Sequence, residues 1–195
     1  MARTANIKRE TRETSIEVKL NLDGTGIGDI DTGIGFFDHM LNNFARHGLF
    51  DLTVKAKGDL YVDCHHLIED VGIVLGQAIK DAAGDKKSIK RYGSAILPMD
   101  DALIMCALDL SGRPYFSYDL RFSTPSCGYF ETAMCREFFY AVSYSAAMNL
   151  HFKMFSGEND HHIIECAFKS FAKALDMAVM TDDRISSVLS TKGTL

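Results

Sequence analysis

Two copies of one histidine-rich motif carry the strongest chemical signal in the sequence. The segments His65–Glu69 (HHLIE) and His161–Glu165 (HHIIE) lie 96 residues apart in a chain of 195. On a helix, residues four apart lie on one face, so the first histidine and the glutamate of each motif can hold one ion. The second histidines, His66 and His162, point about 100° away and would face a different ion. Each motif therefore predicts ligands for two metal ions.

A single motif of this kind is more often a helix start with a histidine–glutamate side-chain pair than a metal site. Its repetition favours metal binding. With His39 and His151 added, six imidazoles and two carboxylates would fill two sites of three histidines and one glutamate each. Taken singly, His39 and His151 are more commonly ordinary core or surface histidines. Nitrogen-rich ligands without thiolates suit manganese, iron, cobalt, nickel or zinc better than magnesium or calcium.

Helical geometry limits how these ligands can meet. Adjacent histidines on a helix diverge, so one half of the chain cannot surround both ions by itself. The ions must be completed across an internal pseudo-twofold axis or across a boundary between subunits. We therefore expect oligomerisation to be a condition of activity.

Composition and charge exclude several other classes of protein. The chain is 47% hydrophobic and 24% charged, as ordinary globular proteins are, and its formal net charge of −5 comes with no basic block that could follow a nucleic-acid backbone. Its apolar runs fall short of the roughly 20 residues of a membrane span, and its N-terminal segment is charged. Five cysteines without a C-x-x-C pair fit a reducing compartment. We expect a cytoplasmic protein with neither nucleic-acid nor membrane partners.

The elements that must position the motifs form two similar halves. In the first half, residues 14–22 alternate as a strand does, Asp23-Gly24 predicts a hairpin turn, and a short second strand should run toward Asp31. A helix from Phe36 to Gly48, a strand at 49–57 and a helix at 67–83 follow. The second half predicts these elements: strands near 94–98, 102–110 and 115–120, a helix at about 131–148, a strand at 150–155 and a helix at about 161–180.

These elements predict an α+β fold that arises by internal duplication. Each half-domain would be a small, mostly antiparallel sheet with two helices on one face, and the two would pack helix to helix. We expect a single fused domain over 1–195, with half-repeats of about 1–90 and 91–185. Residues 186–195 form a C-terminal tail, which by composition alone could simply fray.

Five segments carry a resemblance to a known family: 33–41 (GIGFFDHML), 63–70 (DCHHLIED), 110–114 (LSGRP), 157–165 (GENDHHIIE) and 168–172 (FKSFA). Together they closely resemble the imidazoleglycerol-phosphate dehydratase family. The resemblance implies an enzyme of histidine biosynthesis that forms a shell of 24 subunits and holds two Mn(II) ions per composite active site. It implies dehydration of a phosphorylated imidazole, imidazoleglycerol phosphate, to imidazoleacetol phosphate through a metal-bridged imidazolate.

The resemblance also assigns roles to individual residues. Glu13 would move a proton on the side-chain carbon of the substrate, and His47 or a metal-bound water would assist the leaving oxygen. From the sequence alone, Glu13 is an ordinary solvated charge at the start of a strand. Metal ligands would be His39, His65, His66, Glu69, His151, His161, His162 and Glu165, and substrate contacts would be Glu13, Asn43, His47, Arg91, Arg113, Lys169, Ser190, Thr191 and Lys192.

Lys169 is the most informative of the residues expected to bind phosphate. It continues the His161 and Glu165 stripe by one turn, whereas the equivalent position in the first half is Ile73. A plain helix pair with Glu165 would be worth only about 0.3–0.5 kcal/mol, and the asymmetry between halves favours a ligand role. The arginines would grip phosphate with their planar forks, and the resemblance makes the tail a lid over the substrate.

Two other functions remain open at this point. One is a dinuclear metal hydrolase that acts on a phosphorylated small molecule and needs a metal-activated water. The other is a metal-storage or metal-sensing shell, which would need the histidines but not Glu13, Arg91, Arg113 or Lys169.

Overall fold

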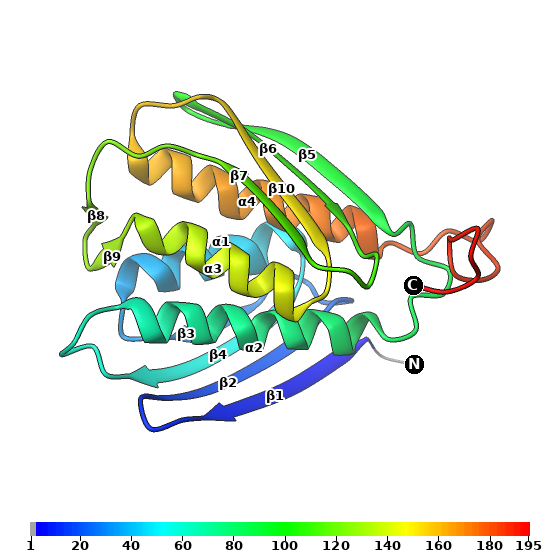
Figure 1. Cartoon of the computed structure of the whole chain (residues 1–195), viewed down its shortest axis with the longest axis horizontal. Coiled ribbons are helices and arrows are strands. Elements are labelled where there is room, and N and C mark those ends of the chain that lie inside the picture. Colours follow the sequence, from blue (N-terminus) through cyan, green and yellow to red (C-terminus); the bar gives the residue numbers. More distant parts are fainter. Residues whose placement is uncertain (1–2) are drawn as a thin grey trace.

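The computed structural model of the chain describes residues 3–195. Figure 1 shows two β-sheets as outer layers with helices from both halves between them. The first half contains β1 (Thr4–Glu10), β2 (Thr14–Asn21), β3 (Gly28–Asp31), α1 (Gly35–Gly48), β4 (Asp51–Gly58) and α2 (His65–Ala83). The second half contains β5 (Tyr92–Met99), β6 (Ala102–Asp109), β7 (Tyr115–Asp119), β8 (Ser126–Cys127), β9 (Phe130–Glu131), α3 (Ala133–Ser145), β10 (Asn149–Ser156) and α4 (Asp160–Val179).

The two main sheets have the same topology. The strand orders are β1-β2-β4-β3 and β5-β6-β10-β7, and in each sheet the last strand runs parallel to its neighbour while the other pairs are antiparallel. The short β8–β9 ribbon is an addition in the second half. The predicted α+β fold with duplicated, mostly antiparallel half-domains is confirmed.

The first half differs from the prediction in two details. The expected hairpin at Asp23-Gly24 is wrong, because β3 pairs in parallel with β4 and does not touch β2. The true hairpin joins β1 to β2, and β1 was not predicted. Its sequence, TANIKRE, ends in three charged residues, which an edge strand tolerates because one of its sides faces solvent.

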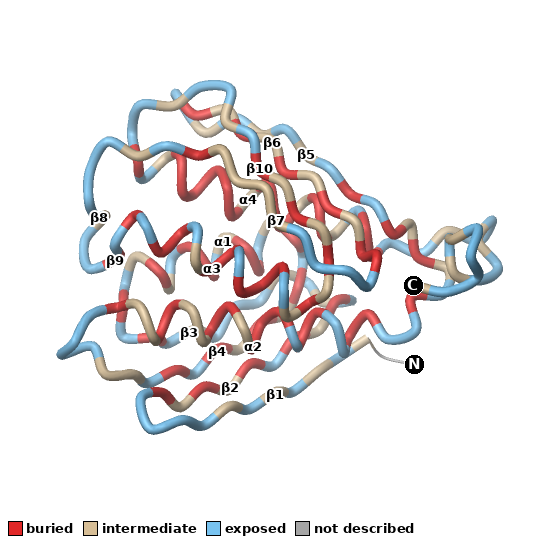
Figure 2. The backbone as a smooth tube through the Cα atoms, viewed as in Figure 1, coloured by how far each residue is buried: buried red, intermediate tan, exposed pale blue. Residues whose placement is uncertain are grey.

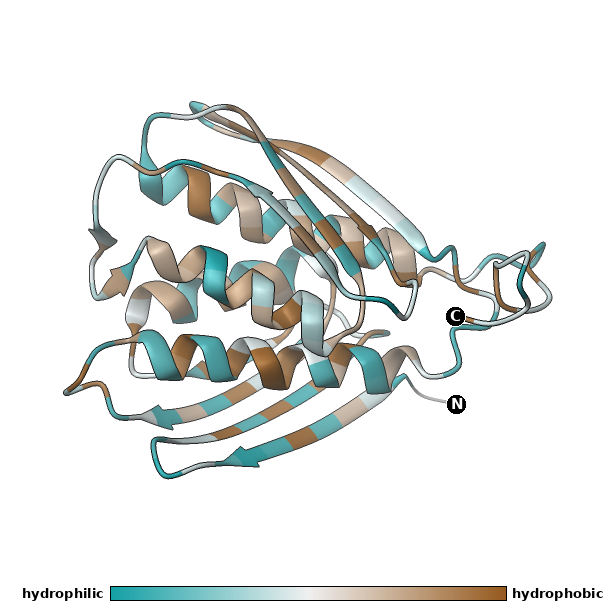
Figure 3. Ribbon diagram, viewed as in Figure 1, coloured by the Kyte–Doolittle hydropathy of each residue, from teal (hydrophilic) through white to brown (hydrophobic). Residues whose placement is uncertain are grey.

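The helices of the two halves pack against each other to form the core. Helix α2 packs on α3, and α1 packs on α4, so each helix pair joins the first half to the second. Figure 2 shows buried residues along the facing sides of helices and sheets, and Figure 3 shows the alternation of hydrophilic and hydrophobic residues along the outer strands. At the centre, the rings of Phe138 and Phe168 stack with centroids 5.1 Å apart, and Phe37 meets Phe138 edge-on at 5.4 Å. The contact between halves is therefore apolar and aromatic.

Each histidine motif lies in the first turn of its helix, where a side chain accepts a backbone N–H of the motif: Asn159 is the N-cap of α4, and Asp63 precedes the N-cap Cys64 of α2. The Asp63 carboxylate accepts a hydrogen bond from the His65 backbone N–H at 2.8 Å, and the Asn159 side chain accepts one from His161 N–H at 2.9 Å. Both helices begin at the left of Figure 1, and the C-terminus lies at the opposite end. The motifs therefore share one end of the molecule, away from the tail. None of the helices described for residues 3–195 is long and apolar enough to cross a membrane.

Candidate metal centre and active site

Three of the predicted metal ligands converge where α1 meets α4. Both His39 Nε2 and His161 Nε2 lie close to Glu165 Oε2, at 3.3 Å and 3.2 Å, and the three ligand atoms fall within 4.8 Å of one another. His39 comes from the first half and the other two residues from the second. Two imidazole nitrogens and a carboxylate oxygen are a donor set that suits a divalent transition metal. The residues present therefore fit a metal ion.

Glu165 is the buried member of this cluster. Its side chain is 8% exposed, and Lys169 Nζ lies 2.6 Å from the Oε1 atom. Burial alone would raise the pKa of Glu165, but the Lys169 ammonium and the His39 ring hold that pKa below the ordinary glutamate value. The rings of His39 and His161 stay about half exposed, so the cluster is open toward one side.

The first motif forms only a pair within the chain. His65 Nε2 lies 3.6 Å from Glu69 Oε2, with both side chains nearly half exposed. Among residues 3–195, no third histidine, cysteine or carboxylate joins this pair to form a ligand group. Ile73, one turn further along, is partly buried and places no charge beside Glu69. The two motifs therefore differ in charge as well as in completeness.

The second histidine of each motif is held by an aspartate. His66 Nδ1 lies 3.0 Å from Asp59 Oδ2, and His162 Nδ1 lies 2.5 Å from Asp101 Oδ1. These hydrogen bonds raise the pKa of both imidazoles. Glu13 Oε2 approaches His66 Nδ1 at 3.8 Å, so the predicted base and this motif do come together.

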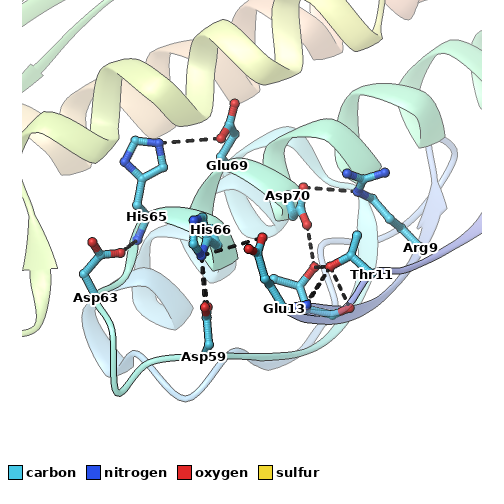
Figure 4. Close-up of polar contacts among 10 residues, drawn as sticks. Arg9, Thr11, Glu13, Asp59, Asp63, His65, His66, Glu69 and Asp70 are labelled. Carbon is cyan, nitrogen blue, oxygen red and sulfur yellow. Dashed lines mark hydrogen bonds and ion pairs between the residues drawn. The ribbon is translucent and has the colours of Figure 1, made fainter.

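The turn that carries Glu13 is attached to α2 (Figure 4). Asp70, the residue after Glu69, accepts a hydrogen bond from Arg9 Nε at 3.1 Å, and its other oxygen bonds the Thr14 hydroxyl. The Thr11 hydroxyl accepts the Glu13 backbone N–H at 3.1 Å. The Glu13 side chain is 57% exposed, so its carboxylate can reach a ligand outside the chain.

A polar stripe on α1 faces the charged stripe of α4. His39, Asn43 and His47 recur every four residues, and Asn43 Nδ2 donates to the His39 carbonyl at 3.1 Å. Burial lowers the pKa of His47, and the charges of Lys169 and Lys173 lower it further, which keeps this imidazole neutral near pH 7. The predicted substrate contacts Asn43, His47 and Lys169 therefore lie along the same helix pair as the cluster.

His151 is not brought to either motif within the chain. Its neighbours Leu150 and Phe152 point into the core, so His151 faces the outer side of the second sheet. Its ring lies 5.4 Å from the Tyr115 ring. Its role as a ligand stays a prediction that requires a contact from outside the chain.

The residues expected to bind phosphate at the tail end are also distant from the motifs. Arg91 makes a two-point pair with Asp109, at 2.7 Å and 3.0 Å, and donates to the Leu189 carbonyl at 2.7 Å. Arg113 is exposed, and Ser190, Thr191 and Lys192 follow in the tail. Arg91 lines one pocket with Ser190 and Thr191, and Gly112, next to Arg113, lies against Leu195. Figure 1 places the C-terminal tail at the end of the molecule opposite the first turns of α2 and α4.

Sequence reasoning missed Glu137 as a counterpart of His39. Five buried positions of α1, from Phe37 to Ala45, recur as buried positions 98 residues later in α3, and the same offset takes His39 to Glu137. Position 53, a threonine on β4, is the counterpart of His151 at this offset. Applying the repeat offset to His39 would have found Glu137. No sequence pattern predicts the contacts of Asp59 and Asp101 with the motifs, because both residues lie outside the helices that carry the motifs.

Comparison with known proteins identifies the family of this chain. A model of imidazoleglycerol-phosphate dehydratase matches residues 32–175. The chain belongs to the imidazoleglycerol-phosphate dehydratase family. It is 62% identical to imidazoleglycerol-phosphate dehydratase of Lachnoclostridium phytofermentans over 195 residues, all of both chains, and 58% identical to that of Acetivibrio thermocellus, again over all of both chains.

Solved structures of imidazoleglycerol-phosphate dehydratases share the fold. The crystal structure from Staphylococcus aureus aligns with a TM-score of 0.83 at 36% identity and covers 92% of this chain and 99% of that one. A structure from Pyrococcus furiosus, in complex with (S)-C348, aligns with a TM-score of 0.84 at 38% identity and covers 97% and 100%. The family resemblance predicted from the motifs is confirmed, and the chain is an enzyme of that family.

The buried carboxylate of this dehydratase-family enzyme predicts a pH dependence of stability. Because the pKa of Glu165 is lowered by folding, its contribution is present above the unfolded glutamate pKa and is lost as pH falls through the folded value. The free energy of unfolding of metal-free protein should therefore fall below about pH 4.5. Glu165→Gln should fall less steeply, as urea titrations at several pH values would measure. The exposed Glu131→Gln serves as the control, and parallel curves for wild type and Glu165→Gln would contradict the assignment.

Proposed function

We propose that this enzyme catalyses the metal-dependent dehydration of imidazoleglycerol phosphate to imidazoleacetol phosphate in histidine biosynthesis. The observation that carries the proposal is the cluster of His39, His161 and Glu165, which joins ligands from both halves of the chain. The reaction removes a hydroxyl from the carbon attached to the imidazole ring and a hydrogen from the next carbon. The enol that results becomes the ketone. The location of this activity in the cytoplasm stays a prediction.

The difficulty of this reaction is the hydrogen, which is not acidic. When bound, two Mn(II) ions would supply positive charge that stabilises the imidazolate form of the substrate ring, whose electrons assist departure of the hydroxyl. The chain supplies the proton carriers. Glu13 lies beside the first motif and takes the proton from the side-chain carbon. That proton and the departing hydroxyl leave together as water, and the neutral His47 donates a hydrogen bond to the leaving oxygen.

We propose that the ligand set is completed by neighbouring chains. The His39 cluster has three ligand atoms and the His65–Glu69 pair has two, whereas a transition metal takes four to six. His66, His162 and His151 diverge from the cluster and are available to other copies. Glu137 joins this proposal as the candidate third ligand beside His65 and Glu69, in the role that His39 has beside His161 and Glu165.

By the same reasoning, we propose that the residues that bind the substrate phosphate come from another copy of the chain. The tail lies at the end of the molecule opposite the motifs (Figure 1), and Arg91 and Arg113 lie beside the tail, so these residues would serve the motifs of another chain. One active site would then combine the motif end of one chain with the tail end of another. This supports a large homo-oligomer, for which we propose the 24-subunit shell that the family resemblance implies.

Activity and metal dependence can be tested together. Purified protein treated with a chelator should lose conversion of imidazoleglycerol phosphate, and adding Mn(II) should restore it. The ketone product is measured through its enolised form, which absorbs in base. Full activity after complete metal removal would contradict the metal-dependent mechanism, and metal binding without conversion would favour the storage-shell alternative.

Glu13→Gln should separate chemistry from binding. It removes the proton acceptor but keeps the shape of the turn, so kcat should fall by about 10²- to 10⁴-fold while metal content and KM stay within about tenfold. The matched control is Glu10→Gln on the preceding strand, which should leave kcat unchanged. Normal turnover by Glu13→Gln would remove it from the role of base.

Complementation tests whether one site combines two chains. Glu13→Gln damages the motif end and Arg113→Ala the tail end, and each variant alone should have little activity. After the two are dissociated, mixed and reassembled, about a quarter of the sites would have wild-type residues at both ends, so activity should rise toward that level. A mixture no more active than the average of the separate variants would show that each chain builds its own site.

A further inference from the structure

We propose that Asp59 and Asp101 are positioning residues that fix the proton of His66 and His162 on Nδ1 and so reserve Nε2 of each ring for a metal ion. The inference rests on the proposed function, because it concerns how these histidines become ligands. It adds two residues that touch neither the substrate nor the metal.

The geometry at the two rings is the same. Asp59 Oδ2 lies 3.0 Å from His66 Nδ1, and Asp101 Oδ1 lies 2.5 Å from His162 Nδ1. A neutral imidazole carries one proton on one of its two nitrogens, and a carboxylate can only accept a hydrogen bond. An aspartate at Nδ1 therefore holds the proton there and leaves the lone pair on Nε2, the arrangement found behind many metal-bound histidines.

Nε2, the other nitrogen of each ring, makes no hydrogen bond within the described residues. Among residues 3–195, no hydrogen bond engages Nε2 of His66, and the nearest charged group to Nε2 of His162 is the exposed carboxylate of Asp100 at 3.5 Å. The first histidines differ, because Nε2 of His65 and of His161 already faces the glutamate of its own motif. The aspartates thus act on the histidines that have no ligand partner in the described part of the chain, residues 3–195.

The two aspartates do not correspond in the internal repeat. Asp59 follows β4, and at the 98-residue offset that holds for β4 the later position is Gly157, whereas Asp101 lies in the turn between β5 and β6. The counterpart of that turn in the first half joins β1 to β2 and carries Glu13. A contact inherited by duplication would come from the same element in both halves. In the first half that turn brings the Glu13 carboxylate only to 3.8 Å from His66 Nδ1, and the hydrogen bond to this atom comes instead from Asp59, after β4. Each ring therefore has a carboxylate hydrogen bond at Nδ1, supplied by a different element in each half.

A purely structural role fits Asp59 poorly. Its side chain is 12% exposed, and the hydrogen bonds that it makes within the described residues go to His66 alone. Asp101 does more, because it also accepts the backbone N–H groups of Glu158 at 2.5 Å and Asn159 at 2.9 Å. Asp59 is therefore the cleaner position for a test, with Asp101 as the second.

The experiment compares Asp59→Asn with Asp63→Asn in the full-length protein. Asp63 lies in the same loop and caps His65 through its backbone N–H, so its substitution removes the same charge without touching an imidazole. Asn159 already caps α4 in the second half, so asparagine suits this position. Asp101→Asn then repeats the test at His162.

Two measurements are made on each protein. Solid-state ¹⁵N spectra of metal-free, ¹⁵N-histidine-labelled protein report which ring nitrogen carries the proton, at a pH about two units above the ordinary imidazole pKa. His66→Gln and His162→Gln assign the signals. Mn(II) affinity is then measured from the electron paramagnetic resonance signal of free Mn(II).

We expect His66 in the wild type and in Asp63→Asn to carry its proton on Nδ1. Asp59→Asn should move part of the population to the Nε2-protonated form and weaken Mn(II) binding at one site by about 10- to 100-fold. An unchanged proton position in Asp59→Asn overturns the inference, as does an equal loss of affinity in Asp63→Asn, which would show an effect of charge alone. If wild-type protein binds no Mn(II), the proposed metal dependence fails, while the proton position in metal-free protein still decides the role of Asp59.

Discussion

A buried carboxylate must be paired, and Glu165 meets this requirement at the contact between the two halves of the chain. Lys169 and His161 approach it from its own helix, and His39 approaches it from α1. The packing of α1 on α4 therefore joins the two halves and also assembles the candidate metal site. If the two halves separated, the aromatic core would be exposed and His39 would move away from Glu165 and His161.

The sequence predicted the helices and the repeat well, for physical reasons. Helix faces leave a 3.6-residue period, and the repeated motif marks equivalent places in both halves. The sequence contains no comparable pattern for strand pairing. An alternation of apolar and polar residues indicates which face of a strand is buried, but it does not indicate which strand is its neighbour. This is why the strand ending at Asp31 was assigned to a hairpin and instead pairs in parallel with β4. The edge strand β1 was not predicted, because its charged residues obscure the short alternation of more and less exposed positions along it.

The candidate site was predictable to the extent that it depends on residue type. His39, His161 and Glu165 were all chosen as ligands, and they meet in space. Choosing by type also selected His151, which faces the outside of the second sheet and whose role as a ligand stays a prediction. It did not consider Glu137, which occupies the place equivalent to His39. Asp59, Asp101 and Asp70 act between elements that are distant in the sequence. Such contacts follow from the folded arrangement alone, and local spacing does not encode them.

The loop before α2 links ligand geometry to whatever covers the surface. Asp59, which holds His66, and Asp63, which caps His65, enclose Leu60, Tyr61 and Val62, and Tyr61 is 91% exposed. A contact that buries these three apolar side chains would also restrain Asp59, which bonds the His66 ring, and Asp63, which bonds the His65 backbone. Binding free energies are reciprocal. If burying this loop raises the affinity for the metal ion by some factor, then the bound ion raises the affinity of the contact that buries the loop by the same factor. The loop therefore couples two events: burial of its surface side chains and binding of the metal ion.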